Sequence, residues 1–459
     1  MHDWTPYLSR SDKPRYLAFA DLIADDLSAG RLHAGDQLPP QRKLAARLSV
    51  DFTTVARGYV EAQRRGLVES RVGQGTFVRA PARAEPSRPP REMPVDLSMN
   101  LPPEPDDPAL ILRMQEGLAE VGRDLVALLR YQGFGGSPAD KDAASSWLGR
   151  RALAPAQDRI FATPGAHPAL LGILGILARP GETVLSEAIT YPGARSISAQ
   201  LGLKLVGIRM DADGIDPDAF ADACREHAPK ALYINPTLQN PTTLTVPEPR
   251  RAAIASVARR YGVPIVEDDA YGFIPLHGLT PFAAIAPDLT WHVAGLAKCI
   301  GAGLRAAYVV APDARAGWPF AAALRASNVM ASPLTVALAT RWIEDGTADS
   351  ILRFIRAETM ARQALARAIL PPGAYRADPL SFHLWVELPP PWTRSAFIGH
   401  MRDTGVGIVA SDAFTVDGAP IEAVRVCLGG PTTRGQVRTA LEFMAHALGE
   451  SPQILSSFL

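Results

Sequence analysis

The sequence predicts a two-domain chain, in which a small α+β domain precedes a large α/β domain built on a mostly parallel sheet. The 459 residues are more than one small domain needs and suffice for one small and one large domain. Residues 80–94 hold five prolines in fifteen residues and few large apolar side chains, which is typical of an extended linker. Beyond them, helical and strand patterns alternate, as in parallel sheets covered by helices. We expect domains at 1–79 and 96–459, joined by a linker at 80–95.

The small domain is predicted to contain three helices and a hairpin. Apolar residues recur at helical spacing over residues 16–29, 41–48 and 53–64, and Asp51 stands where it would cap the third helix. Residues 67–70 and 76–78 are predicted to be two strands joined by a glycine-containing turn. This order of elements is that of a winged helix-turn-helix.

The small domain also carries the positive charge that nucleic-acid binding requires. Residues 31–79 contain nine Lys or Arg and four Asp or Glu, although the whole chain has a formal net charge of zero. Because a recognition helix enters the major groove with its first turn foremost, residues on three elements are expected to meet DNA. They are Phe52, Thr53, Thr54 and Arg57 on the third helix, Arg42 and Lys43 on the second, and Arg71 and Gly75 in the hairpin. The alternative is a basic helical module that binds another protein.

The stretch from Gly30 to Val78 resembles the GntR superfamily of bacterial regulators. It contains the phrase G-x-x-x-x-G-x-x-L-P-x-x-R-x-L-A, a T-V-x-R-x-Y recognition helix and a G-x-G-T-F-V wing. The resemblance implies that the domain binds operator DNA. The family usually has a Ser-Arg pair where this chain has Asp51 and Phe52, so an arginine that commonly helps to hold DNA is missing. We therefore expect an unusual operator sequence or affinity.

The large domain is predicted to alternate buried strands with helices. The strands are expected at 159–162, 183–185, 231–234, 264–266, 291–294 and 306–310, and helices at 110–129, 169–178 and 250–261. Short strands return at 381–388 and 424–428 after longer helices. A smaller α+β portion is therefore expected to pack on the parallel sheet.

Residues suited to one kind of chemistry follow these strands. Lys298 comes after the strand at 291–294 and offers an amine for a Schiff base, and Arg305 after it suits a phosphate. Asp268 lies at the carboxyl end of a parallel strand, where ligands bind in such sheets. The amides of a helix that begins after the strand at 159–162 form a further anion site. They belong to Gly165, Ala166 and His167. These are the groups that pyridoxal phosphate needs from a protein.

Four other residues complete the expected pocket. Tyr191 would stack on the cofactor ring, whereas Asn240 and Tyr271 would reach its phenolic oxygen. Tyr191 and Asn240, taken singly, have structural alternatives. Arg425, in a predicted strand, would hold a carboxylate through two parallel hydrogen bonds.

Residues 96–447 resemble the aspartate-aminotransferase-like enzymes of fold type I, which use pyridoxal phosphate. The resemblance implies that Lys298 forms the Schiff base, that Asp268 pairs with the pyridine nitrogen and that Tyr131 reaches the phosphate of the partner subunit. The family's Ser-x-Ser-Lys phrase is replaced by Gly295, Leu296, Ala297 and Lys298, and Pro164 replaces a phosphate-binding serine. We therefore expect weaker phosphate binding and an emphasis on sensing over catalysis.

A GntR-type winged helix followed by a linker and an aminotransferase-like domain resembles the MocR subfamily of bacterial transcription regulators. The resemblance implies a domain-swapped homodimer with shared pyridoxal phosphate sites, which binds operator DNA and senses pyridoxal 5'-phosphate, a small amino compound, or both. One alternative is a working aminotransferase with an attached DNA-binding domain. Another is a regulator whose large domain has lost the cofactor and serves in dimerisation and effector binding.

The remaining composition restricts where the protein acts. Three cysteines lie far apart without a C-x-x-C spacing, which argues against a disulfide framework or a zinc site. No run of about 18 uncharged apolar residues and no secretory leader pattern is present. We expect a cytoplasmic protein without a metal site or a membrane segment.

Overall fold

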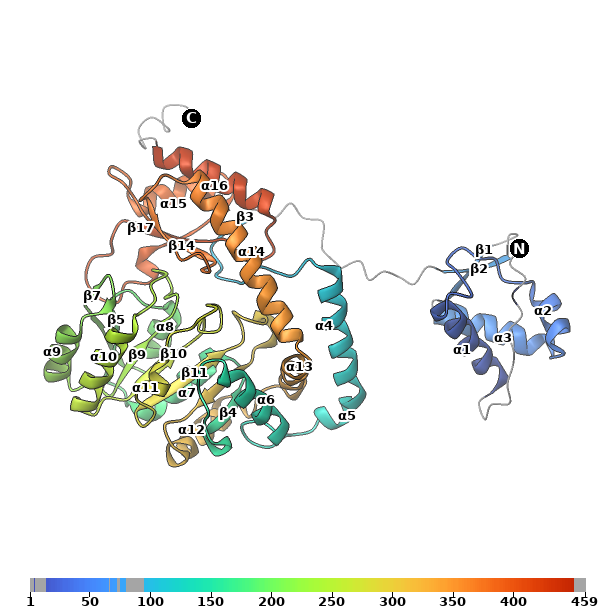
Figure 1. The fold of residues 1–459 in the computed structure, drawn as a ribbon, viewed down its shortest axis with the longest axis horizontal. Helices are drawn as coiled ribbons and strands as arrows, with labels where there is room; N and C mark the ends of the chain where they lie inside the picture. Colours follow the sequence, from blue (N-terminus) through green and yellow to red (C-terminus); the bar gives the residue numbers. More distant parts are fainter. Residues whose placement is uncertain (1–3, 5–13, 66, 72–74, 80–94, 450–459) are drawn as a thin grey trace. The chain divides into compact units, whose positions relative to one another are not determined.

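The computed structural model describes residues 4, 14–65, 67–71, 75–79 and 95–449. The chain divides into two compact units, Met1–Glu92 and Met93–Leu459 (Figure 1). We call them the small domain and the large domain. The predicted linker at 80–95 lies, except for Val95, outside the described residues.

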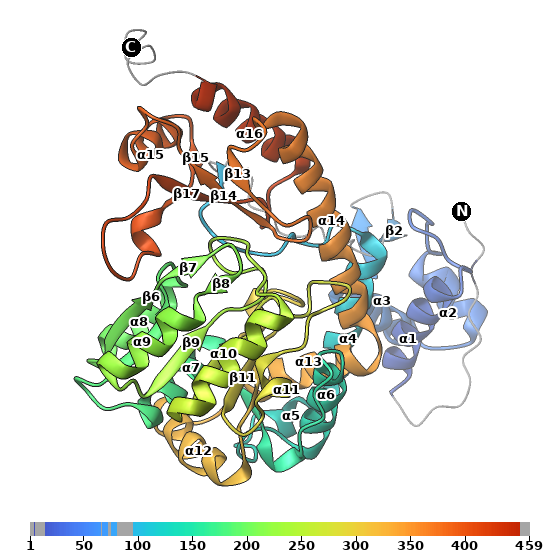
Figure 2. The ribbon, with the colours of Figure 1, turned by 60° about the vertical axis from the view of Figure 1, so that its left-hand side comes forward.

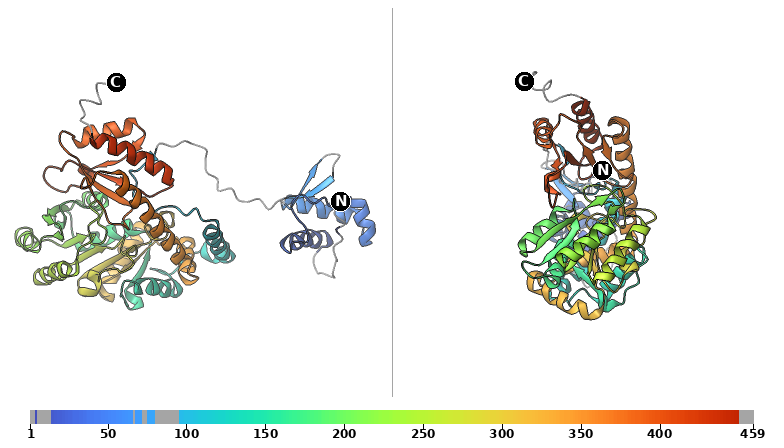
Figure 3. Two further views of the ribbon diagram at one scale, coloured as in Figure 1. Left: turned by 45° about the horizontal axis from the view of Figure 1, so that its top comes forward. Right: turned by 90° about the vertical axis from the view of Figure 1, so that its left-hand side faces the viewer.

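The small domain has the predicted winged-helix order. Its helices are α1 (Arg15–Ser28), α2 (Gln41–Leu48) and α3 (Phe52–Arg64), and β1 (Val68–Arg71) pairs antiparallel with β2 (Gly75–Val78) (Figure 3). Asp51 caps α3 as predicted, because its carboxylate accepts a hydrogen bond from the Thr53 amide at 2.7 Å. Phe19, Leu44 and Val55 are buried together, so each helix contributes to one apolar core.

The large domain is organised around a seven-stranded sheet. The strand order is β4-β12-β11-β10-β9-β5-β6, and every neighbouring pair is parallel except the two pairs that include β12. The strands are β4 (Ile160–Thr163), β5 (Thr183–Glu187), β6 (Lys204–Ile208), β9 (Ala231–Ile234), β10 (Ile265–Asp268), β11 (Thr290–Gly295) and β12 (Ala307–Val310). The prediction of a mostly parallel sheet is thus confirmed.

Helices cover both faces of this sheet (Figure 2). Alternation along β5 places Val184 in one apolar layer and Leu185 in the other. The Val184 layer includes side chains of α7 (Ala166–Leu177), α8 (Pro192–Gln200) and α12 (Ala314–Asn328). The Leu185 layer includes side chains of α9 (Pro217–His227), α10 (Glu248–Tyr261) and α11 (Phe282–Ile285), and the hairpin β7 (Met210–Asp211) and β8 (Gly214–Ile215) precedes α9.

The smaller α+β portion is built on an antiparallel sheet of order β13-β14-β17-β16. Its strands are β13 (Tyr375–Arg376), β14 (His383–Glu387), β16 (Val409–Ala410) and β17 (Ala423–Cys427), with β3 (Val95–Asp96) parallel to β15 (Val406–Gly407) beside them. Helices α15 (Arg394–Asp403) and α16 (Arg434–Gly449) complete this portion. The long helix α14 (Thr347–Ile369) joins it to the rest, because Ile351 packs in the core beneath the large sheet and Ala366 in the core of this portion (Figure 1).

The prediction of one continuous helix over 110–129 is wrong. The structure has α4 (Pro108–Val121), a 3-10 turn (Gly122–Asp124) and α5 (Leu125–Leu128). Gly122 stands where α4 ends, and glycine lowers helix stability. Further helices are α6 (Pro138–Gly149) and α13 (Pro333–Glu344), and short 3-10 turns lie at Gln157–Arg159, Ala302–Leu304 and Ser411–Ala413.

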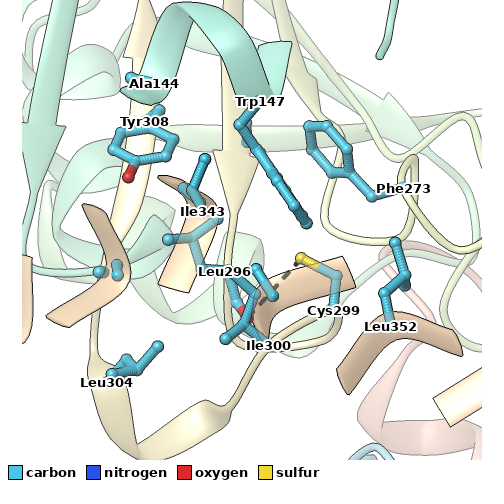
Figure 4. Packing of buried hydrophobic residues seen from close by; sticks show 14 of the residues in the cluster. Ala144, Trp147, Phe273, Leu296, Cys299, Ile300, Leu304, Tyr308, Ile343 and Leu352 are labelled. Atoms are coloured by element: carbon cyan, nitrogen blue, oxygen red, sulfur yellow. Dashed lines mark hydrogen bonds between the residues drawn. The ribbon is translucent and has the colours of Figure 1, made fainter. Parts of the chain in front are cut away.

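The turn that carries Lys298 packs against the hydrophobic core through its apolar residues. Cys299, the next residue, is completely buried among Trp147, Ile300 and Leu352 (Figure 4). Its thiol donates to the Leu296 carbonyl at 3.8 Å, and burial raises its pKa to about 12. Cys299 is therefore a packing residue that anchors the Lys298 turn to the core.

Candidate functional site

The candidate site is a cavity of about 360 Å³ at the carboxyl ends of the parallel strands. This is where ligands bind in open α/β sheets. Nine of the predicted ligand residues line it, namely Gly165, Ala166, His167, Tyr191, Asn240, Asp268, Tyr271, Lys298 and Arg305, together with the predicted effector residue Arg425. The fold thus brings ten side chains and backbone groups from distant parts of the sequence into one cavity.

Lys298 lies in the turn directly after β11. Its Nζ donates a hydrogen bond to the carbonyl oxygen of Asn100. Burial lowers the pKa of the amine to about 8, since a charged ammonium loses hydration inside the protein. About a tenth of Lys298 is therefore neutral and nucleophilic at pH 7, far more than for an ordinary lysine.

Asp268 is the last residue of β10 and is buried. Its Oδ2 accepts a hydrogen bond from the Tyr233 hydroxyl at 2.8 Å, whereas its Oδ1 is buried without a partner among the described residues. Burial raises the pKa of this carboxyl group to about 6, so it is mainly ionised at pH 7. An unpaired buried carboxylate oxygen beside a cavity is suited to a protonated ring nitrogen.

The two acidic neighbours of Asp268 have other partners. Glu267 accepts hydrogen bonds from the first amides of α11, Phe282 N at 2.8 Å and Ala283 N at 3.0 Å. Asp269 forms a buried ion pair with Arg151 at 2.8 Å. Of the three consecutive acids, only Asp268 lines the cavity.

The predicted phosphate cup lies at the beginning of α7. Gly165 has a φ of +103°, and a Cβ there would lie 3.2 Å from the guanidinium Nη2 of Arg305. Glycine therefore permits a backbone conformation that other residues rarely adopt, and it lets Arg305 approach the helix terminus. No side chain caps this terminus of α7, which leaves its first amides available to an anion. Burial, with Arg305 nearby, lowers the pKa of His167, which favours its neutral form.

Two positions beside the predicted phosphate cup lack the hydroxyl groups of the usual family pattern. Gly295 and Ala297 line the cavity beside Lys298. A Cβ added at Gly295 would meet Ala166 Cβ at 3.6 Å and Ala270 Cα at 3.9 Å, both ordinary contacts. A Cβ is therefore accommodated at Gly295, so crowding at this atom does not require glycine there.

Arg425 projects from β17 of the α+β portion into the cavity. Its Nη1 donates to Oδ1 of Asn240 at 2.8 Å and its Nη2 donates to the Ser98 carbonyl at 2.5 Å, while its buried Nε has no partner among the described residues. The guanidinium also lies 4.9 Å from the centre of the Phe414 ring. The group is thus held in place by neutral acceptors that a carboxylate would outcompete.

Tyr131 does not line this cavity. It follows α5 and is 85% exposed. The neighbouring apolar side chains Val126 and Leu129 are also exposed, by 72% and 69%. The predicted contact of Tyr131 with a partner subunit's phosphate stays a prediction.

Several residues of the site were not anticipated from the sequence. Asn100 donates to the Tyr271 hydroxyl at 2.9 Å, and its amide nitrogen lies 3.2 Å from Nδ1 of His383. Asn235 donates to the Asp268 carbonyl at 2.7 Å and accepts from the Asn240 amide. The P-x-x-Q-N-P stretch directly after Asn235 is the one signal that points to this residue, whereas Asn100 lies far away in the sequence without a recognisable pattern.

In the small domain, most of the predicted DNA-contacting side chains are solvent-exposed. Arg42, Lys43, Thr53 and Arg57 are exposed, Phe52 is 44% exposed and Thr54 is half-buried. The side chain of Arg71 lies outside the described residues, whereas Gly75 is exposed with a φ of +113°.

Part of the basic charge of the small domain is used within it. Arg64 and Arg65 both pair with Glu61, at 2.8 Å. Arg42 lies over the Phe52 ring at 5.9 Å, so α2 and the beginning of α3 share one exposed face.

Comparison with known proteins identifies both domains. The model of the aminotransferase class I and II family matches residues 92–444. The chain belongs to this family. Residues 15–78 match the gntR family of bacterial regulatory proteins. The protein is accordingly a GntR-type transcriptional regulator with an aminotransferase-like domain, an organisation consistent with the MocR subfamily.

Relatives share this two-domain organisation along most of their length. The HTH-type transcriptional regulator YdeF of Bacillus subtilis is 27% identical over 453 residues, which cover 97% of each chain. The vitamin B6 salvage pathway transcriptional repressor PtsJ of Salmonella typhimurium is 27% identical over 420 residues, 89% of this chain and 93% of PtsJ. A regulator is thus favoured over an aminotransferase with an appended DNA-binding domain.

Solved aminotransferases share the fold of the large domain. LysN, the α-aminoadipate aminotransferase of Thermus thermophilus in complex with N-(5'-phosphopyridoxyl)-L-leucine, is similar with a TM-score of 0.70 and 21% identity, over 80% of this chain and 93% of LysN. The kynurenine aminotransferase of Pyrococcus horikoshii in complex with PMP has the same TM-score and identity, over 77% and 90%. The predicted fold type I is confirmed.

Among the helices in the described part of the chain, none has the length and apolar character that crossing a bilayer requires. The same residues contain no group of three or more His, Cys, Asp or Glu side chains placed to hold a metal ion.

Proposed function

We propose that this regulator binds operator DNA through its winged helix and binds pyridoxal 5'-phosphate, together with a small carboxylate-bearing amino compound, in the cavity of the large domain. Occupancy of that cavity would change how the protein holds its operator. We further propose that the protein acts in the cytoplasm as a homodimer, with the domain limits 1–79 and 96–459 and the linker 80–95 predicted from the sequence.

The observation that carries the proposal is the unpaired Oδ1 of Asp268, which lies in the same cavity as the Lys298 amine. A buried acceptor without a partner is costly, and the folded chain tolerates it where a ligand supplies the donor. The glycine-lined cup beside Arg305 would hold the phosphate at the opposite end of such a ligand. When bound, pyridoxal 5'-phosphate supplies an aldehyde that condenses with amines and a ring that withdraws electrons.

Each residue would have a separate task. Lys298, with its pKa near 8, offers the amine that holds the aldehyde carbon. Asp268 keeps a proton on the ring nitrogen, and Tyr233 orients that carboxylate through its hydroxyl. Arg425 exchanges its neutral acceptors for the carboxylate of the amino compound, since ionised hydrogen bonds are about twice as strong as neutral ones.

The cup provides backbone amides and Arg305, but no hydroxyls at positions 164, 295 and 297. Each missing neutral hydrogen bond costs about 1 kcal/mol of binding free energy. Weak phosphate binding suits a sensor, because a ligand that exchanges freely reports its own concentration.

The homodimer proposal rests on the surface around Tyr131. Exposed apolar side chains gather on α4, α5 and the residues after them, and such patches mark interfaces between proteins. They are Leu112, Leu118, Leu125, Val126, Leu129 and Tyr131. Light scattering during size-exclusion chromatography tests this part. The native protein should elute as a dimer and Val126→Glu as a monomer, whereas a monomeric native protein would refute it.

The absorbance spectrum of the purified full-length protein tests cofactor binding. Addition of pyridoxal 5'-phosphate to the native protein should produce a visible band, and dialysis should remove it. Lys298→Ala should lack the band, and Lys230→Ala, at a partly exposed surface lysine paired with Glu182, should keep it. A band of equal intensity in Lys298→Ala would exclude Lys298 as the residue that reacts.

A further inference from the structure

The segment Ser98–Asn100 crosses the cavity of the large domain. The chain is fixed to the α+β portion on either side of it, because the Leu97 carbonyl accepts from Cys427 N at 2.8 Å and the Pro102 carbonyl from Gly430 N at 3.1 Å. Between these anchors, Met99 and Asn100 line the cavity. Asn100 is 7% exposed and its buried Oδ1 has no hydrogen-bond partner among the described residues.

Three cavity residues hold this segment. Lys298 Nζ donates to the Asn100 carbonyl, and Arg425 Nη2 donates to the Ser98 carbonyl at 2.5 Å. The Tyr271 hydroxyl accepts from the Asn100 side chain at 2.9 Å. The Asn100 carbonyl oxygen is thus the acceptor of the buried Lys298 amine, and the Ser98 carbonyl oxygen is a second acceptor for Arg425 beside Oδ1 of Asn240.

The same three residues are the ones that the proposed ligand requires. When the neutral Lys298 amine condenses with an aldehyde, a C=N bond forms and both amine protons leave in water with the aldehyde oxygen. In its uncharged form Nζ then has no proton to donate to the Asn100 carbonyl. A ligand carboxylate likewise competes with the Ser98 carbonyl for Arg425, and a charged acceptor is preferred over a neutral one.

We infer that Ser98–Asn100 is an internal occupant of the ligand cavity, which a ligand must displace from Lys298 and Arg425 in order to bind. The inference rests on the proposed function and adds how occupancy is sensed. The predicted linker ends at Val95. The internal occupant therefore lies a few residues after the linker, at the beginning of the large domain. Ligand binding is then coupled to the attachment of this segment to Lys298 and Arg425, because each weakens the other.

Hydrogen–deuterium exchange of the full-length protein tests the displacement. With pyridoxal 5'-phosphate added, peptides covering residues 97–103 should exchange several-fold faster than in the ligand-free protein. Ligand-free Lys298→Ala should show faster exchange in the same peptides, because the tie to the Asn100 carbonyl is absent. Unchanged or slower exchange at 97–103 in the presence of the visible absorbance band overturns the inference and leaves the proposed function intact.

If no band appears on addition of pyridoxal 5'-phosphate, the proposed function fails, and ligand-free Lys298→Ala alone decides the inference. Faster exchange at 97–103 in this variant then supports a tie between Lys298 and the segment. Exchange equal to that of the native protein overturns it.

The affinity for pyridoxal 5'-phosphate gives an independent test with a matched pair of variants. Asn100→Ala removes one hydrogen bond of the internal occupant and should bind the compound about two- to tenfold more tightly. Asn328→Ala should bind like the native protein, because Asn328 is exposed at the end of α12 and does not line the cavity. Weaker binding by Asn100→Ala would assign Asn100 to holding the ligand and would refute its role as a competitor.

Discussion

Replacing Asp268 with asparagine should stabilise the ligand-free large domain and abolish its binding of pyridoxal 5'-phosphate. Burial raises the pKa of this carboxyl group from 3.8 to about 6. At about 1.4 kcal/mol per pKa unit, the charge of Asp268 costs the folded protein about 3 kcal/mol at pH 7. Asparagine carries no charge and keeps an oxygen for the Tyr233 hydroxyl, but it places an unpaired N–H where Oδ1 stood. That unpaired N–H lowers the free energy of unfolding by about 1–2 kcal/mol, so the variant should gain about 1–2 kcal/mol of stability in total.

The pH dependence of this gain follows from the sign of the pKa change. A carboxyl group with a raised pKa binds more protons in the folded than in the unfolded chain, so its contribution to stability falls as pH rises. The advantage of Asp268→Asn should be smallest below about pH 4, should grow as pH rises through about 6, and should be constant above that. Thermal unfolding of the ligand-free proteins at a series of pH values measures it.

Asp403→Asn is a suitable control, because Asp403 is exposed at the end of α15. It should leave the melting temperature unchanged at every pH. A lower melting temperature for Asp268→Asn at pH 7 would refute the assignment of a buried, costly charge. Binding of pyridoxal 5'-phosphate should weaken at least 100-fold, since removing one partner of a buried ion pair costs about 3–5 kcal/mol.

Three further outcomes are expected. Gly295→Ser should bind pyridoxal 5'-phosphate about fivefold more tightly, because its Cβ meets only ordinary contacts and its hydroxyl adds about 1 kcal/mol of binding free energy. Gly165→Ala should bind the compound more weakly. Equilibrium dialysis measures both affinities, and affinities equal to that of the native protein would show that these residues do not hold the phosphate. The rate at which the native protein gains its visible band should rise with pH through about 8, as the Lys298 amine loses its proton; a pH-independent rate would contradict this. Lys43→Ala should weaken DNA binding similarly for all sequences and reduce the slope of log affinity against log salt by about 1, as measured by fluorescence anisotropy; an unchanged slope would show that Lys43 does not meet a phosphate.

The sequence was sufficient for the order of the elements in the small domain, for most strands of the large sheet and for the residues that lie next to strand ends. Lys298 and Asp268 were predictable because each comes after a short apolar run that is typical of a buried strand, and ligands bind at the carboxyl ends of parallel strands. The α3 cap was predictable because Asp51 directly precedes an apolar pattern of helical period.

What could not be predicted depends on contacts between distant segments. Tyr233 lies within a buried strand, where an aromatic residue usually serves packing, and only the pairing of β9 with β10 brings its hydroxyl to Asp268. Asn100 reaches Lys298 because the chain after β3 crosses the cavity, which no local pattern indicates. The break at Gly122 was missed because the apolar spacing continues past it and the cost of one glycine is small.

Binding of operator DNA with the cavity empty and with it filled shows whether ligand occupancy controls the hold on DNA. A DNA fragment selected from a random pool by the full-length protein serves as the probe, and its affinity is measured with and without pyridoxal 5'-phosphate for the native protein and for Lys298→Ala. The compound should change the affinity of the native protein for this DNA at least fivefold, about 1 kcal/mol of coupling free energy, and should leave that of Lys298→Ala unchanged. An equal response in both proteins, or no response in a native protein that shows the visible band, would contradict this prediction.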